Sequence, residues 1–149
     1  MHTIRTLLGD RTTYSVQSSW TVREVIDYLC ERSIGAVVVC DGDEVVGVFS
    51  ERDVLRRIVQ PNLDPDTTPV SQVMSPGVHY VTPDVTHRDA RYKMFEKGVR
   101  HLVVLDDDKR LLGFLSMREV IEVDLEEQRE LVHKLNDDYY QRAYMPEKK

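Results

Sequence analysis

Apolar residues follow two different spacings along this chain, and the two spacings alternate in the same order in each half. In the first half, apolar positions three and four residues apart predict one face of a helix between residues 22 and 30. Apolar runs at 36–40 and 45–49 then flank a short acidic turn, which is typical of a β-hairpin. A short strand is expected before this helix, at 14–17, and a second helix after the hairpin, from Ser50.

The second half repeats this order. A strand is expected at 79–82, then a helix with an apolar face that ends at Gly98, a hairpin of the runs 101–105 and 111–115, and a helix from Ser116. The expected face of the first of these helices consists of Ala90, Met94 and Phe95. With one residue inserted near Asp108 or Lys109, the two halves align. The pattern predicts an α/β (α+β) protein of two tandem β-α-β-β-α repeats.

The same pattern divides the chain into four parts. Residues 1–61 form the first repeat with an N-terminal helix, 62–75 a linker rich in Pro, Asp and Thr, 76–125 the second repeat, and 126–149 a C-terminal helix and tail. An apolar stripe along the last helix needs a surface to cover. The first repeat's opening helix, a second copy of the chain or another protein are the three alternatives.

Composition excludes several classes of function. A net charge of −6 argues against binding to nucleic acid or to an anionic membrane surface. The N-terminus shows no signal peptide and the longest apolar run, 36–40, is too short to span a bilayer, so a cytoplasmic protein is expected. Five histidines show no metal-ligand spacing, and the sequence has neither a phosphate-binding Gly-rich loop nor a nucleophile motif. We therefore expect no metal site and no enzyme activity.

Candidate binding chemistry lies at the end of the first hairpin. Gly47 leaves room for a close approach, Ser50 offers a hydroxyl at a helix start, Arg52 suits a phosphate, and the carboxylate of Asp53 suits a ribose diol. The alternative is that Ser50 and Asp53 form a capping box that only starts the helix. The two roles are compatible.

Four short strings make this chain resemble the CBS domain pair. They are residues 47–53, the linker string 73–76, the strand entry 98–106, and residues 113–119. The resemblance implies repeats packed sheet to sheet with pseudo-twofold symmetry, two clefts between them, and a homodimer of such pairs. It also implies adenosine-containing ligands: AMP, ADP, ATP, S-adenosylmethionine or NAD(H), with no cofactor required.

The resemblance also implies roles for individual residues. Ser50 would contact phosphate or ribose and Asp53 the ribose hydroxyls, while strand residues near 18–21 and 34–37 would line the base pocket. Those lining residues are Ser18, Thr21, Ile34, Gly35, Ala36 and Val37. In the second copy, Ser116, Arg118 and Glu119 take the matching positions. Glu119 is one methylene longer than Asp and better suited to capping, so the first site is expected to be the competent one.

Arg100 and His101 match Gly35 and Ala36. They either add positive charge near a phosphate or are solvated residues at a strand entrance. The leading hypothesis is an adenosine-nucleotide-binding regulatory module that senses energy or metabolite state and acts on a separate, unidentified protein as a homodimer. The alternative is a ligand-independent dimerisation or scaffold protein.

Overall fold

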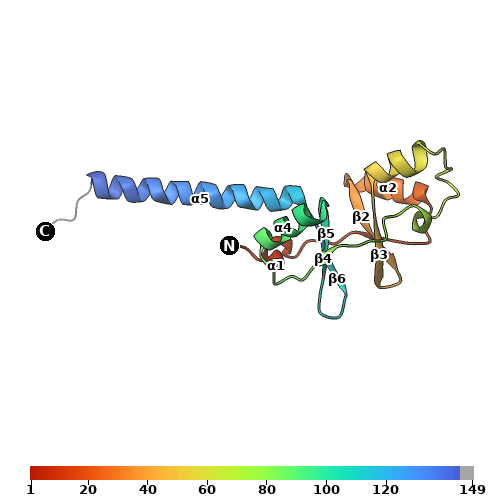
Figure 1. Ribbon diagram of the computed structural model, residues 1–149, viewed down its shortest axis with the longest axis horizontal. Helices are drawn as coiled ribbons and strands as arrows, with labels where there is room; N and C mark the ends of the chain where they lie inside the picture. The colour runs from red at the N-terminus through yellow and green to blue at the C-terminus, as the bar shows by residue number, and fades with distance from the viewer. Residues whose placement is uncertain (145–149) are drawn as a thin grey trace.

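A computed structural model describes residues 1–144 and contains two three-stranded sheets flanked by helices (Figure 1). The first repeat consists of β1 (Ser15–Gln17), α2 (Val22–Arg32), β2 (Ala36–Asp41), β3 (Glu44–Ser50), α3 (Glu51–Asp53) and the π-helical turns η1 (Val54–Val59). The second consists of β4 (Tyr80–Val81), α4 (His87–Lys97), β5 (His101–Leu105), β6 (Leu111–Ser116) and α5 (Met117–Tyr144). Two short helical segments, α1 (Ile4–Leu8) and η2 (Val70–Gln72), precede the repeats.

The two sheets have the same topology. In each, the first strand pairs in parallel with the second, which pairs antiparallel with the third. The register shifts at matching positions, between Val39 and Cys40 and between Val104 and Leu105. This agreement confirms the predicted fold class of two tandem β-α-β-β-α repeats.

The main helices begin where the sequence predicts. Thr21 caps α2 and Thr86 caps α4, each in a capping box with the acid three residues later. Gly98 ends α4 with φ +65°, a left-handed conformation that glycine adopts without strain. The predicted apolar face of α4 is wrong in one position. Ala90 and Met94 are buried, but Phe95 is 70% exposed.

The sheets face each other across a small core that joins the repeats. Four buried residues, Val38, Cys40, Val103 and Leu105, form this core with partly buried neighbours. The opposite face of each sheet packs against its own helices in a separate core. Each strand is therefore covered on both sides, which explains the unbroken apolar runs. The predicted sheet-to-sheet packing is confirmed.

The short helical segments are exchanged between the repeats. α1 lies at the N-terminus but packs in the second core, where the Ile4 amide donates to the carbonyl oxygen of Val85 (2.9 Å). η2 precedes the second repeat but packs in the first core, where the Val70 amide donates to the carbonyl oxygen of Trp20 (2.8 Å). The prediction that grouped the N-terminal helix with the first repeat is corrected accordingly, because its apolar side chains belong to the second core.

α5 is one continuous helix of 28 residues that extends well beyond the two sheets (Figure 1). It runs through the predicted boundary between residues 125 and 126. Its first turns pack in the second repeat, whereas every residue from 128 to 144 is exposed. The predicted tail beyond residue 144 lies outside the described residues. Within residues 1–144, no helix is both long and apolar enough to cross a membrane.

Candidate functional site

A cleft of about 750 Å³ lies where the two repeats and the linker meet. Its position follows from strand pairing, because Ala36 at the start of β2 lies opposite Ser50 at the end of β3, and His101 opposite Ser116. Both repeats therefore present strand ends and loop residues at one edge. The cleft is lined by polar, charged, aromatic and small residues of both repeats, among them Gly35, Ala36, Ser50, Arg52, Asp53, Ser75, Gly77, His79, Arg100, His101 and Phe114.

Ser50 and Asp53 form a complete capping box at one side of the cleft. The amide and hydroxyl of Ser50 both donate to Oδ2 of Asp53, at 2.9 and 3.2 Å, and the Asp53 amide donates back to Ser50 Oγ at 3.3 Å. The other oxygen, Oδ1, lies 3.6 Å from Nε of Arg57, which is too long for a hydrogen bond. Oδ1 can therefore accept hydrogen bonds from a ligand while Oδ2 caps the helix.

The second repeat supplies basic and aromatic groups to the same cleft. Arg100 lines it with an exposed side chain, as does Arg52 from the first repeat. The His101 ring stacks on Phe114, with centroids 4.9 Å apart and an interplanar angle of 23°. Burial lowers the pKa of His101 below its ordinary value, so its ring is neutral at neutral pH. The cleft thus combines acceptors, guanidinium groups and an aromatic surface.

Gly47 does not line the cleft, which corrects its predicted role. A Cβ at this position would lie 2.6 Å from Sδ of Met74 and 3.0 Å from the carbonyl oxygen of Ser75. Glycine at this position therefore lets the linker, and not a ligand, pack closely against β3. Gly113 occupies the matching position in β6, where a Cβ would lie 2.5 Å from Cδ2 of Leu8.

Four other predicted residues also lie away from the cleft. Ser18 follows β1 at the opposite end of the sheet, since Gln17 pairs with Cys40, and Thr21 caps α2. Val37 is fully buried in the first core and Ile34 packs against it. Gly35 and Ala36, which lie between them, do line the cleft.

Glu119, the acidic residue at the matching position of the second repeat, already has partners within the protein for both carboxylate oxygens. The amide of Ser116 donates to Oε2 of Glu119 (2.7 Å), and Arg11 forms an ion pair with Oε1. Burial alone would raise the pKa of Glu119, but these bonds outweigh it and hold the pKa below its usual value. Arg118 points along the helix surface to Glu122 at 3.0 Å. Ser116, Arg118 and Glu119 are therefore not brought together with Ser50 and Asp53.

The sequence interpretation missed three lining residues: Ser75 at the end of the linker, and Gly77 and His79 just before β4. Ser75 pairs with Val48 of β3 through two backbone hydrogen bonds of 2.9 and 3.0 Å, which draws the linker along the sheet. The string Val73–Pro76 marks this segment in the sequence. Its composition, however, does not reveal that it returns to the first repeat.

Paired sheets with exchanged helical segments and a cleft between them define a tandem-repeat module. The family model of the CBS domain matches residues 10–60 and 70–126, so the chain belongs to the CBS domain family and carries two copies of the domain. An uncharacterized protein of Methanopyrus kandleri is 31% identical over 105 residues, covering 70% of this chain. This chain spans 54% of the length of that relative.

Two solved structures show the same fold with higher coverage. A CBS domain protein from Burkholderia ambifaria is 30% identical with a TM-score of 0.78, covering 85% of this chain and 96% of its own. The CBS domain protein of Pyrobaculum aerophilum, solved in complex with AMP, is also 30% identical with a TM-score of 0.71. That match covers 79% of this chain and 89% of the Pyrobaculum chain.

Proposed function

We propose that this chain is a non-catalytic regulatory module that binds an adenosine nucleotide in the cleft and transmits the bound state to a separate protein. The observation that carries the proposal is the position of Asp53 opposite Arg100 and His101 of the other repeat. Within residues 1–144, its Oδ1 makes no hydrogen bond and has only Arg57 Nε nearby, at 3.6 Å. The AMP complex of the Pyrobaculum aerophilum protein supports AMP as the first ligand to test. ADP, ATP, S-adenosylmethionine and NAD(H) are the further candidates.

Each part of the cleft has a proposed task. Asp53 Oδ1 accepts hydrogen bonds from the ribose hydroxyls, and Ser50 Oγ, with a remaining lone pair, assists. The guanidinium groups of Arg52 and Arg100 bind phosphate oxygens. The stacked pair of His101 and Phe114 offers an apolar surface to the adenine ring.

A ligand in this position would connect the two repeats. Because its contacts come from both, it binds most tightly to one relative arrangement of the sheets and shifts the population toward that arrangement. Ser75 of the linker, with Gly77 and His79 just after it, lines the same cleft and would respond to the same shift. This is how occupancy would alter a surface seen by another protein.

We further propose that the pair acts as a homodimer. Apolar side chains on the outer faces of α4 and α5 are exposed, including Tyr92 at 72% and Phe95 at 70%. η1 of the first repeat exposes Leu55 and Val59 in the same way, at 61% each. A second copy would bury these side chains, which are unusual on a free surface.

A thermal melt with each candidate ligand tests nucleotide binding. A ligand present at about 100 times its Kd should add about 2.7 kcal/mol and raise the Tm by several degrees. Asp53→Ala should abolish the shift, while Asp43→Ala, which removes an exposed acid in the first hairpin turn, should keep it. Unchanged ATP and NADH after incubation would support binding without turnover.

The second candidate function is a ligand-independent dimerisation or scaffold protein. It is favoured by the exposed half of α5, which carries Leu131, Val132 and Leu135 at 57–58% exposure. The thermal melt separates the two candidates, because a scaffold shows no thermal shift with any of the ligands. Light scattering then checks self-association, which a scaffold keeps in Asp53→Ala.

A further inference from the structure

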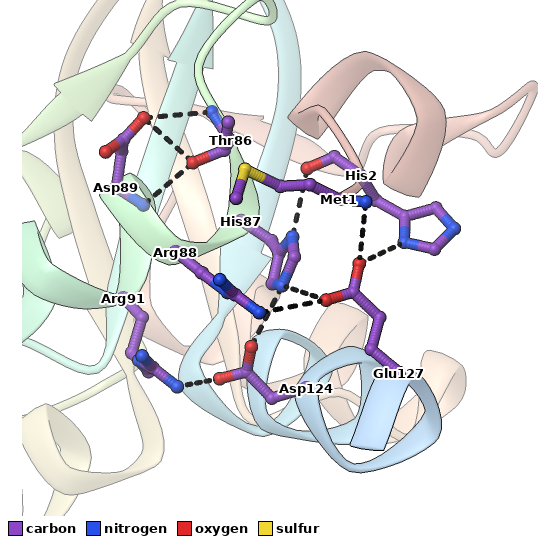
Figure 2. Close-up of polar contacts among 9 residues, drawn as sticks. All are labelled: Met1, His2, Thr86, His87, Arg88, Asp89, Arg91, Asp124 and Glu127. Atoms are coloured by element: carbon purple, nitrogen blue, oxygen red, sulfur yellow. Dashed lines mark hydrogen bonds and ion pairs between the residues drawn. The ribbon is translucent and has the colours of Figure 1, made fainter. Parts of the chain in front are cut away.

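A second polar cluster lies outside the cleft, where the N-terminal segment, α4 and α5 converge (Figure 2). Four side chains from these three segments, His2, His87, Asp124 and Glu127, point toward one another. Ligand atoms of His2, His87 and Glu127 all lie within 4.8 Å of each other. His87 is completely buried, whereas the side chain of His2 is 46% exposed and closes the cluster from the solvent side.

The protonation of His87 follows from its backbone contact. Its Nδ1 lies 3.0 Å from the carbonyl oxygen of His2, which can only accept, so Nδ1 carries a proton. In the neutral ring, Nε2 then presents a lone pair. Within residues 1–144, this buried Nε2 has no hydrogen-bond partner, although Asp124 Oδ1 lies 2.9 Å away and Glu127 Oε2 3.4 Å away.

A buried lone pair that faces two carboxylate oxygens calls for a cation between them. A proton on Nε2 is one solution and would give ion pairs with Asp124 and Glu127, although Nε2 makes no hydrogen bond within residues 1–144. A metal ion is the other solution, because it binds the lone pair and a carboxylate at once. Donation of the remaining ring N–H to a backbone carbonyl is the arrangement that metal-binding histidines adopt.

We propose that His2, His87 and Glu127 form a site for a divalent transition metal, with Zn²⁺ as the preferred ion. Two imidazoles and one carboxylate suit a tetrahedral Zn²⁺ that keeps water in the fourth position. Ligand atoms around one zinc lie about 3.4 Å apart, given metal–ligand distances near 2.1 Å. His87 Nε2 lies 3.4 Å from Glu127 Oε2, and His2 Nδ1 lies 3.0 Å from Glu127 Oε1, so the His2 ring would move outward slightly to hold the ion.

Arginines hold the two carboxylates in place. Arg91 forms an ion pair with Oδ2 of Asp124, which leaves Oδ1 directed at His87. Arg88 lies 3.5 Å from Oε2 of Glu127, and with a side chain 54% exposed it is free to move away when a cation binds. The amino nitrogen of Met1 also contacts Glu127, at 3.2 Å from Oε1.

The site differs from the expectation of no metal because its ligands are far apart in the chain. His2 is 85 positions from His87 and 125 from Glu127, so no local spacing reveals the group. A bound metal would fasten the N-terminal segment and α5 to α4. The site is independent of the nucleotide cleft, since the two share no residue.

Cobalt titration tests the site in the full chain, prepared without a histidine tag and stripped with a chelator. Co²⁺ should bind one ion per chain and give the strong visible absorption of a tetrahedral complex, which Zn²⁺ should then abolish. Zn²⁺ should also raise the Tm, whereas Mg²⁺ at the same concentration should not, because Mg²⁺ requires octahedral oxygen ligands.

Matched variants locate the binding. His2→Ala and Glu127→Gln should each weaken Co²⁺ binding at least tenfold, while His133→Ala and Glu126→Gln, both exposed on α5, should leave it unchanged. These substitutions avoid removing the buried His87 ring, so loss of fold does not confuse the result. Absence of the tetrahedral spectrum, or equal binding by all four variants, would overturn the proposal.

Discussion

Glu119 forms an ion pair with Arg11, which lies 108 positions earlier in the chain. The aligned carboxylate of the first repeat, Asp53, instead faces Arg57 on its own helical segment at 3.6 Å. In the second repeat, the carboxylate oxygen that does not cap the helix is paired with a distant arginine. In the first repeat, the matching oxygen is left partly open. The difference explains why we place the nucleotide in the cleft beside Asp53.

Removal of the Arg11 side chain tests how the Glu119 carboxylate contributes to stability. Arg11→Ala should raise the pKa of Glu119 and lower the free energy of unfolding at pH 7 by about 0.5–1 kcal/mol, a modest value because both groups are partly exposed. The folded pKa lies below the unfolded value of 4.5, so this stabilisation is present above pH 4.5 and is lost as the pH falls through the folded pKa.

Urea unfolding at pH 7 and pH 3 measures this difference. The gap between the wild type and Arg11→Ala should be clear at pH 7 and smaller at pH 3. Arg5→Ala, which breaks an exposed pair with Asp84, serves as the control and should change little at either pH. An equal gap for Arg11→Ala at both pH values would contradict the assignment.

A second prediction concerns the contact between β3 and the linker. Gly47→Ala should destabilise the protein by about 1–3 kcal/mol, because the new methyl group would meet Met74 and the rigid carbonyl of Ser75. Gly77→Ala is the matched control, since within residues 1–144 no atom lies within 4 Å of the position that its methyl group would take. Chemical denaturation of both variants is sufficient, and equal stabilities would show that the linker can move aside.

Nucleotide binding should change the titration of His101. Burial holds the pKa of this ring below 6.5 in the free protein, and an adenine ring stacked on it would bury it further. Histidine NMR spectra recorded against pH should therefore show the His101 pKa falling further when AMP is added. The signals of His133 on the exposed part of α5 should be unaffected, and an unchanged His101 in protein saturated with AMP would place the adenine ring elsewhere.

The exposed half of α5 should be dispensable for folding. A chain ending at residue 127 should keep its Tm within about 2 °C, because all described residues beyond that point are exposed. A chain ending at residue 119 should fail to fold stably, since it loses the fully buried Val120 and the ion pairs of Asp124. If the chain ending at residue 127 stays folded but has a lower mass by light scattering than the full chain, the removed part of α5 is responsible for self-association.

Local patterns were sufficient to predict the elements of the fold. Helix starts at Thr21 and Thr86 depend on residues three positions away, and the hairpins depend on neighbouring apolar runs, so both are readable from a few adjacent letters. The exposure of Phe95 was not readable, because it depends on which helical face meets the sheet. The exchange of α1 and η2 was missed for a similar reason: it is determined by contacts between distant segments.

The predicted site residues lie together where one short segment carries them. Ser50, Arg52 and Asp53 are consecutive or nearly so, and the structure places them together in the cleft with Arg100 and His101. Ser18 and Thr21 were placed there by resemblance, but strand pairing moves them to the opposite end of the sheet. His79 lacked any local signal, since its place in the cleft depends on pairing with β5, where the Val103 amide donates to its carbonyl oxygen at 3.0 Å.

The exchange of α1 and η2 has a consequence for how the molecule unfolds. A fragment of residues 1–61 would contain α1 without its partners and would lack Val70 and Val73 of its own core. The complementary fragment would lack Ile4 and Leu8. We therefore expect the two repeats to melt together, as a single cooperative folding unit.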